Sequence, residues 1–62
     1  MEPTQEEILR EAAIKRDQVI TADDLLKDMF SVHVKVRDNH YYDVEFKKEG
    51  SVWDNGTILP SL

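Results

Sequence analysis

The hydrophobic residues of this 62-residue chain change their spacing near residue 31, and this change limits which elements the chain can form. Before that point apolar side chains recur every three or four residues, which is the period of an amphipathic helix. After it they alternate with polar side chains, which is the period of a half-buried strand. We therefore predict a single α+β domain over residues 1–62, with two N-terminal helices packed on one face of an antiparallel meander of three or four strands.

The first half contains two helix start signals. Thr4 and Glu7 match a capping box, which predicts a first helix over about residues 5–16. A second start signal at Thr21 predicts a helix over about residues 22–30. Its apolar stripe at helical spacing consists of Ala22, Leu25, Leu26, Met29 and Phe30. We expect this stripe to cover one face of the sheet.

The second half predicts strands over about residues 32–37, 41–47, 51–54 and 57–59, in the order ααββββ. A three-residue loop over residues 38–40 would pair Val36 with Tyr42 and Val34 with Val44, so that apolar side chains share one face. The same register pairs Val32 with Phe46, Lys35 with Asp43 and His33 with Glu45. Asn39 suits the left-handed backbone position of such a loop.

The last two strands contain the Trp of the chain and its strongest hairpin signal. Asn55-Gly56 is typical of a type I′ turn, whose two central residues have positive φ. A hairpin there would set Ile58 beside Trp53 on the outer, solvated face of the sheet, with Trp53 opposite Glu45. The alternative is that Trp53 turns inward through a bulge and fills the core.

Charge and composition restrict the class of protein. The chain has 13 acidic and 8 basic side chains, a net charge of -5 and no cysteine, so it has neither disulfides nor a thiolate zinc site. A domain this short is only marginally stable alone, and self-association or a partner would supplement it. The chain has no membrane-length apolar run, and its acidic start lacks the basic region of a signal peptide, so we expect a cytoplasmic protein.

Catalytic and metal-binding patterns are weak. His33 falls in a predicted strand and His40 in a predicted turn, and no serine or acid stands at a spacing that would complete a catalytic set with them. The same histidines and nearby acids show no known metal-ligand spacing. We therefore predict a protein that is not an enzyme and that binds no cofactor and no metal.

The segment Val19-Ile20-Thr21-Ala22-Asp23-Asp24-Leu25-Leu26 resembles the second helix of winged-helix proteins. The predicted order of helix, turn, helix and hairpin also agrees with that family. The resemblance implies a nucleic-acid-binding regulator, whose contacts would come from Lys35, Arg37, Lys47 and Lys48. No third, recognition helix precedes the first strand, and the second helix is acidic, so nucleic-acid binding is the alternative function.

Protein binding is the main prediction. An outer sheet face that combines aromatic and basic residues has the composition of a protein-binding patch. Its predicted contact residues are Trp53, Tyr41, Arg37, Lys35 and Ile58. Acids of the helices form a second predicted surface for a basic partner, namely Glu6, Asp23, Asp24 and Asp28. We expect a small regulator or inhibitor of the kind that bacteria and their phages encode, with a structural homo-oligomer, such as a homodimer, as a second alternative.

Overall fold

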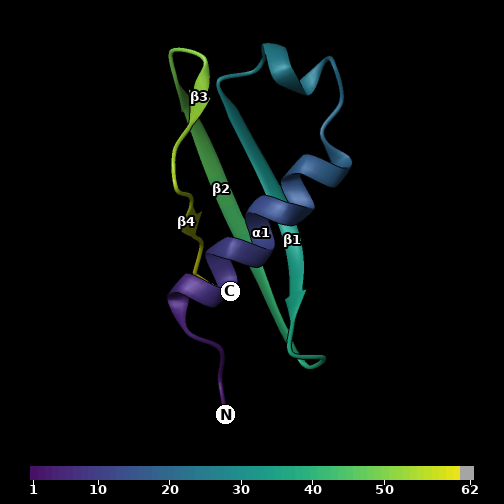
Figure 1. Cartoon of the computed structure of the whole chain (residues 1–62), viewed down its shortest axis with the longest axis vertical. Helices are drawn as coiled ribbons and strands as arrows, with labels where there is room; N and C mark the ends of the chain where they lie inside the picture. The colour runs from purple at the N-terminus through teal and green to yellow at the C-terminus, as the bar shows by residue number, and fades with distance from the viewer. Residues whose placement is uncertain (61–62) are drawn as a thin grey trace.

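The computed structural model describes residues 1–60 and has one helix packed on one face of an antiparallel sheet (Figure 1). In chain order the elements are the helix α1 (Gln5–Val19), the 3-10 turn η1 (Asp24–Leu26) and the strands β1 (Met29–Val36), β2 (His40–Glu49), β3 (Val52–Trp53) and β4 (Thr57–Ile58). The predicted α+β class with a four-stranded antiparallel sheet is confirmed. The predicted order ααββββ is wrong in one respect, because the described residues contain a single α-helix.

The helix α1 begins where the capping box predicts. The Thr4 hydroxyl accepts a hydrogen bond of 3.1 Å from the Glu7 backbone N–H, which satisfies one of the unpaired donors of the first turn. The helix runs three residues beyond the predicted end at residue 16. It stops at Ile20, whose extended backbone still donates its N–H to the Arg16 carbonyl.

The predicted second helix over residues 22–30 is wrong, although its start signal is used. The Thr21 hydroxyl accepts a hydrogen bond of 3.3 Å from the Asp24 N–H, and the Asp24 carboxylate accepts one of 3.0 Å from the Thr21 N–H. Only the 3-10 turn η1 follows. The chain is extended again at Met29, because Met29 and Phe30 pair with β2 as the first residues of β1. Strand pairing thus overrides the helical spacing of this segment.

The sheet has the predicted faces but a different register. Val34 pairs with Tyr42, and Val32 pairs with Val44, so β1 is shifted by two residues from the predicted alignment of Val34 with Val44. Side chains alternate along a strand, so a shift of two residues keeps every side chain on its face. The predicted apolar set therefore points the same way in both registers.

The turn between β1 and β2 has the predicted length but begins one residue earlier, at residues 37–39. Positive φ angles occur at Arg37 (52°) and Asp38 (64°), and not at Asn39 as predicted. The predicted pair of Lys35 with Asp43 is also wrong, because Lys35 lies opposite Tyr41. A hydrophobic pattern of period two cannot distinguish the two registers.

The predicted hairpin at Asn55-Gly56 does not form, since β3 and β4 both pair with β2 and lie along the same edge. Residues 54–56 make a bulge between them. The Asp54 carboxylate accepts hydrogen bonds from the N–H groups of Lys47 (3.1 Å) and Gly56 (3.0 Å). Gly56 has φ of 94°, and a Cβ atom there would lie 2.8 Å from Cε1 of Phe46. A glycine is therefore required where the bulge crosses the core.

The core lies between α1 and the face of the sheet that we call the covered face. Its buried residues are Ile8, Ala12, Val32, Val34, Val36, Val44 and Phe46. The helix crosses this face diagonally from β4 towards β1 (Figure 1), and it packs against both strands. The apolar stripe of residues 22–30 was expected to cover this face of the sheet. Ile8 and Ala12 of α1 cover it instead. The opposite face, which we call the outer face, has no helix over it among residues 1–60.

Candidate protein-binding surface

Two of the five predicted sheet contacts, Lys35 and Tyr41, lie on the outer face. They are directly opposite each other on β1 and β2, and Tyr41 is 55% exposed. The Tyr41 ring stacks on His33, with ring centroids 5.6 Å apart. Nδ1 of His33 lies 2.8 Å from a carboxylate oxygen of Asp43, its partner across the strands. This part of the outer face is a polar cluster around one aromatic side chain.

Trp53 and Ile58 lie on the covered face, so the prediction that both lie outside is wrong. Trp53 pairs with Lys48 rather than lying opposite Glu45, and its ring centroid is 6.3 Å from that of Phe30. The Lys48 ammonium lies 5.0 Å from the Trp53 ring centroid, a cation–π distance. Both residues are partly buried and pack against the core, as the alternative prediction for Trp53 requires.

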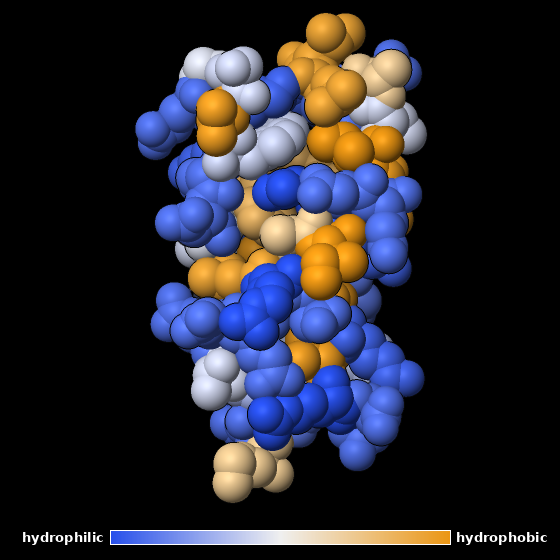
Figure 2. Space-filling model, viewed as in Figure 1, coloured by the Kyte–Doolittle hydropathy of each residue, from blue (hydrophilic) through white to orange (hydrophobic). Residues whose placement is uncertain are grey.

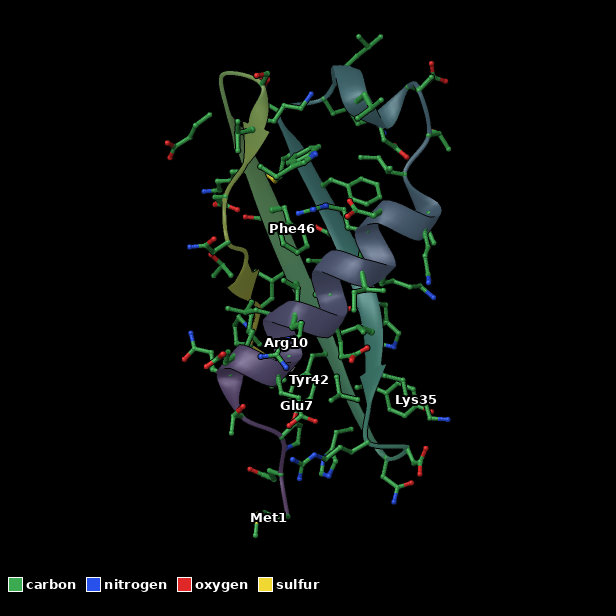
Figure 3. All side chains as sticks on the ribbon, in the orientation of Figure 1. Met1, Glu7, Arg10, Lys35, Tyr42 and Phe46 are labelled. Atoms are coloured by element: carbon green, nitrogen blue, oxygen red, sulfur yellow. The ribbon has the colours of Figure 1, made fainter. Side chains whose placement is uncertain are left out.

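Arg37 does not contact Tyr41, because its guanidinium is bound elsewhere. Nε and Nη2 of Arg37 donate hydrogen bonds of 2.8 Å each to the two carboxylate oxygens of Glu7. In Figure 3 Glu7 points from the first turns of α1 towards the end of the sheet where β1 turns into β2. The hydrogen bonds from Arg37 lower the pKa of Glu7, and Glu7 raises the pKa of Arg37. Arg37 therefore joins the helix to the sheet.

The largest exposed apolar side chains of the sheet and of η1 gather at one end of the molecule, which we call the apolar end. It consists of Leu25 (50% exposed), Leu26 (86%), Met29 (49%) and Val52 (67%). These residues share an end because Met29 begins β1, while Val52 follows the β2–β3 turn. Figure 2 shows hydrophobic side chains gathered at the end of the molecule formed by η1. Several exposed apolar residues at one end of a molecule, with polar residues around them, are typical of protein contact sites.

Hydrogen bonds from Lys48 attach η1 to the sheet. The Lys48 ammonium donates to the Leu25 carbonyl, and the Lys48 backbone N–H donates to the Asp28 carbonyl at 2.9 Å. The position of Leu25 and Leu26 is therefore set by β2, although neither side chain is buried. This arrangement presents the two leucines to solvent on an anchored segment.

Three of the four predicted acidic contacts, Asp23, Asp24 and Asp28, belong to the segment that carries Leu25 and Leu26. Asp23 and Asp28 are exposed, whereas the Asp24 side chain is only 16% exposed and bonds to Thr21 and Lys27. Hydrogen bonds from the backbone and hydroxyl of Thr21 lower the pKa of Asp24, which keeps its carboxylate charged. The fourth, Glu6, lies apart on α1 and binds Arg10 at 3.2 Å (Figure 3 labels Arg10).

An open groove separates α1 from β3 and the bulge. Its apolar lining comes from Leu9, Ala13, Phe46 and Trp53. The Arg16 guanidinium lies 4.7 Å from the centroid of the Phe46 ring, so an arginine covers part of this lining. Within residues 1–60, no three His, Cys, Asp or Glu side chains are placed to hold a metal ion. The described chain likewise has no helix of the length and apolarity that a membrane span needs.

The residues of the candidate contact site that the sequence does not indicate are the apolar ones. Leu25, Leu26 and Met29 were predicted to face the core because they fit a helical stripe, and Val52 was placed in a strand without a contact role. One signal was available. Phe30 also fits the alternation of Val32, Val34 and Val36, so the strand period extends backwards into the predicted helix. The segment that resembles the second helix of winged-helix proteins consequently has no α-helix beyond Val19 and contains only the 3-10 turn η1.

No protein-family model, no curated protein and no solved structure matches this chain.

Proposed function

We propose that this protein is a small, non-enzymatic protein-binding module that acts as a regulator or inhibitor by direct contact. Its contact site is the apolar end, with the surrounding aspartates as a charged rim. The partner is a protein that offers an apolar pocket bordered by basic side chains. The observation that carries the proposal is the 86% exposure of Leu26 on a segment held by Lys48.

Burial of the apolar end would supply most of the binding free energy. Covering the four large apolar side chains would stabilise the complex by about 25 cal/mol for each Å² of apolar surface removed from water. Because Lys48 already fixes the segment that carries Leu25 and Leu26, this segment would lose little conformational entropy on binding. Asp23 and Asp28 would attract a basic partner at long range and exclude partners of the same charge. Because the rim contributes mostly to the association rate, this part of the affinity should weaken as salt is added.

The test compares two variants that each remove one exposed apolar side chain. Leu26→Ser changes the apolar end, and Ile14→Ser is the matched control, since Ile14 is 48% exposed but lies on α1. Each protein is immobilised and used to capture proteins from an extract of its native host. We expect to capture a specific partner, and Leu26→Ser should weaken its binding about tenfold or more, because burying a leucine side chain contributes about 1.5–3 kcal/mol. The partner should remain bound to Ile14→Ser.

Equal loss of the partner with both variants, or with neither, would contradict the proposal. Circular dichroism of both variants checks that the fold is intact. The nucleic-acid alternative predicts that the protein binds random duplex DNA and that its affinity falls steeply as salt is added. The contacts would come from Lys35, Arg37, Lys47 and Lys48. The homo-oligomer alternative predicts that the molecular mass measured by light scattering decreases on dilution.

A further inference from the structure

The free edge of the sheet, on β1, directs a row of backbone groups outward. The Asp28 carbonyl accepts from the Lys48 N–H at 2.9 Å, so this pair is a hydrogen-bonded pair of the antiparallel ladder. Such pairs alternate along two strands, which means that the even-numbered residues of β1 bond to β2. The residues whose N–H and C=O groups point away from β2 are therefore Met29, Ser31, His33 and Lys35.

Independent hydrogen bonds on the other side of β2 agree with this assignment. The carbonyls of Asp43 and Lys47 accept from the N–H groups of Leu59 and Asp54, each at 2.8 Å. Odd-numbered residues of β2 therefore face β3 and β4, which leaves the even-numbered ones to face β1. No other strand within residues 1–60 pairs with β1.

The β1 edge carries one of the charged side chains that oppose strand pairing, Lys35, but lacks the other local devices. It is eight residues long, has no proline, keeps one register throughout and points valines and a phenylalanine to the covered face. The opposite edge differs in length, continuity and proline content. There β3 and β4 are two residues each, the bulge at residues 54–56 separates them, and Pro60 follows.

The apolar side of α1 extends beyond the free edge of β1. Ile8, Ala12 and Val19 lie within about 40° of one another around the helix axis. Ile8 and Ala12 are buried by the sheet, but Val19 is 43% exposed. The C-terminal end of α1 has therefore passed beyond the sheet, as Figure 1 shows at β1. A strand added to β1 would lie beneath this end of the helix.

We propose that β1 binds an extended segment of another protein, which joins the sheet as an additional strand. Every second side chain of the bound segment is apolar. These side chains cover Val19 and the part of the covered face next to β1. The remaining side chains lie on the outer face, and the one opposite Lys35 is acidic. Figure 3 shows Lys35 on the side of β1 away from β2, where such a residue would meet it. A second copy of this chain does not fit, because its own α1 would meet the overhanging helix.

This inference does not depend on the apolar end, and its experiment uses a peptide instead of an unidentified partner. The probe is the capped peptide acetyl-Glu-Val-Thr-Val-Thr-Val-Glu-amide, which places a glutamate opposite Lys35 in either strand direction. The readout is amide hydrogen exchange and amide chemical shift of the isotope-labelled full chain, with and without peptide. We expect the outward amides of Ser31, His33 and Lys35 to exchange at least about tenfold more slowly with bound peptide. The inward amides of Val32 and Val34 should be protected in both states.

Two pairs of variants separate the backbone contact from the charge contact. Ser31→Pro removes an outward N–H and should weaken peptide binding about fivefold, whereas Ser31→Thr keeps this donor and should bind normally. Lys35→Glu should weaken binding about threefold, and the control Lys47→Glu, one strand away, should not. If Ser31→Pro fails to fold, the exchange pattern of the unmodified chain still decides.

Three results would overturn the inference. One is a shift of amides in β3 and β4, or around the groove, in place of those in β1. Another is protection of the outward amides without peptide that increases with protein concentration, because it would mean that a second copy occupies the edge. The third is no binding at millimolar peptide. Loss of the partner with Leu26→Ser does not bear on any of these results, so the two proposals fail separately.

Discussion

Two segments of this chain have apolar residues at helical spacing, and only one of them is a helix. Residues 5–19 form α1 and bury Ile8 and Ala12, whereas residues 22–30 make a single 3-10 turn and then a strand. Both segments use their predicted start signals, at Thr4 and at Thr21. The difference is therefore not in how the two segments begin but in what each can pack against.

A helical stripe becomes a helix only if the sheet leaves a face for it to cover. In this chain α1 packs on the covered face through Ala12 and Ala13. Phe30 instead extends β1 and pairs with Phe46. The apolar residues between the two elements, Leu25 and Leu26, then remain exposed. Residues 22–30 thus form a strand end instead of a helix, and two of their apolar side chains are left in solvent.

The largest expected difference between the two segments is the loss in unfolding free energy when one apolar residue of each is truncated to alanine. Ile8→Ala should lower the free energy of unfolding by about 2–4 kcal/mol, because it removes buried methyl groups and leaves a cavity. Leu26→Ala should lower it by no more than about 0.5 kcal/mol, since the side chain is 86% exposed. Urea denaturation followed by circular dichroism measures both values. Similar losses in the two variants would mean that residues 22–30 also pack on the core.

A smaller difference is expected between the two start signals. Thr4→Ala removes the cap of a 15-residue helix and should cost about 1 kcal/mol of unfolding free energy. Thr21→Ala removes the cap of one exposed turn and should cost less than half as much. Thermal unfolding compares the two, with Thr4→Ser as the control that keeps the hydroxyl. A larger loss from Thr21→Ala would mean that η1 contributes to the core.

The smallest expected effect concerns acid. Hydrogen bonds lower the pKa of both Glu7 and Asp24 in the folded chain, so the folded state binds fewer protons than the unfolded state. Their stabilisation is complete at neutral pH and is lost as the pH falls below about 5. Glu7→Gln should reduce this acid sensitivity more than Asp24→Asn, because Glu7 joins α1 to the sheet while Asp24 bonds only residues 21–27.

Urea midpoints at pH 7, 5 and 3 measure this effect in the unmodified chain and in both variants. A midpoint that rises as the pH falls would contradict the assignment of both carboxylates. Arg37→Gln, which removes the partner of Glu7, is the matched control and should give the same pH dependence as Glu7→Gln.

The faces of the sheet could be predicted from the sequence, but its register could not. Val32, Val34, Val36, Val44 and Phe46 are buried as the alternation indicates. The two-residue shift between β1 and β2 keeps all of them on the same face, so nothing in the pattern opposes it. The turn decides between the two registers, because Arg37 and Asp38 take positive φ and the Arg37 guanidinium reaches Glu7.

The candidate site could be predicted only in part. Lys35 and Tyr41 are on the outer face as expected, and Asp23 and Asp28 are exposed, whereas Asp24 is partly buried. Trp53 and Ile58 could not be placed. The face of Trp53 depends on the turn at residues 50–51, between Glu49 and its partner Val52, and the face of Ile58 depends on the bulge at residues 54–56. The Asn55-Gly56 pair indicates positive φ and local freedom, but it does not distinguish a tight hairpin from a bulge that both adjoining strands make with β2.

Features that depend on neighbouring residues follow from the amino-acid sequence alone. These are the start of α1 at its Thr4 cap, the α+β class and the two faces of β1 and β2. Three other features follow only from packing in the folded chain: which helix covers the sheet, which residues pair across the strands and which apolar side chains remain in water. These features depend on competition between distant segments for one apolar face, and local spacing carries no information about which segment wins.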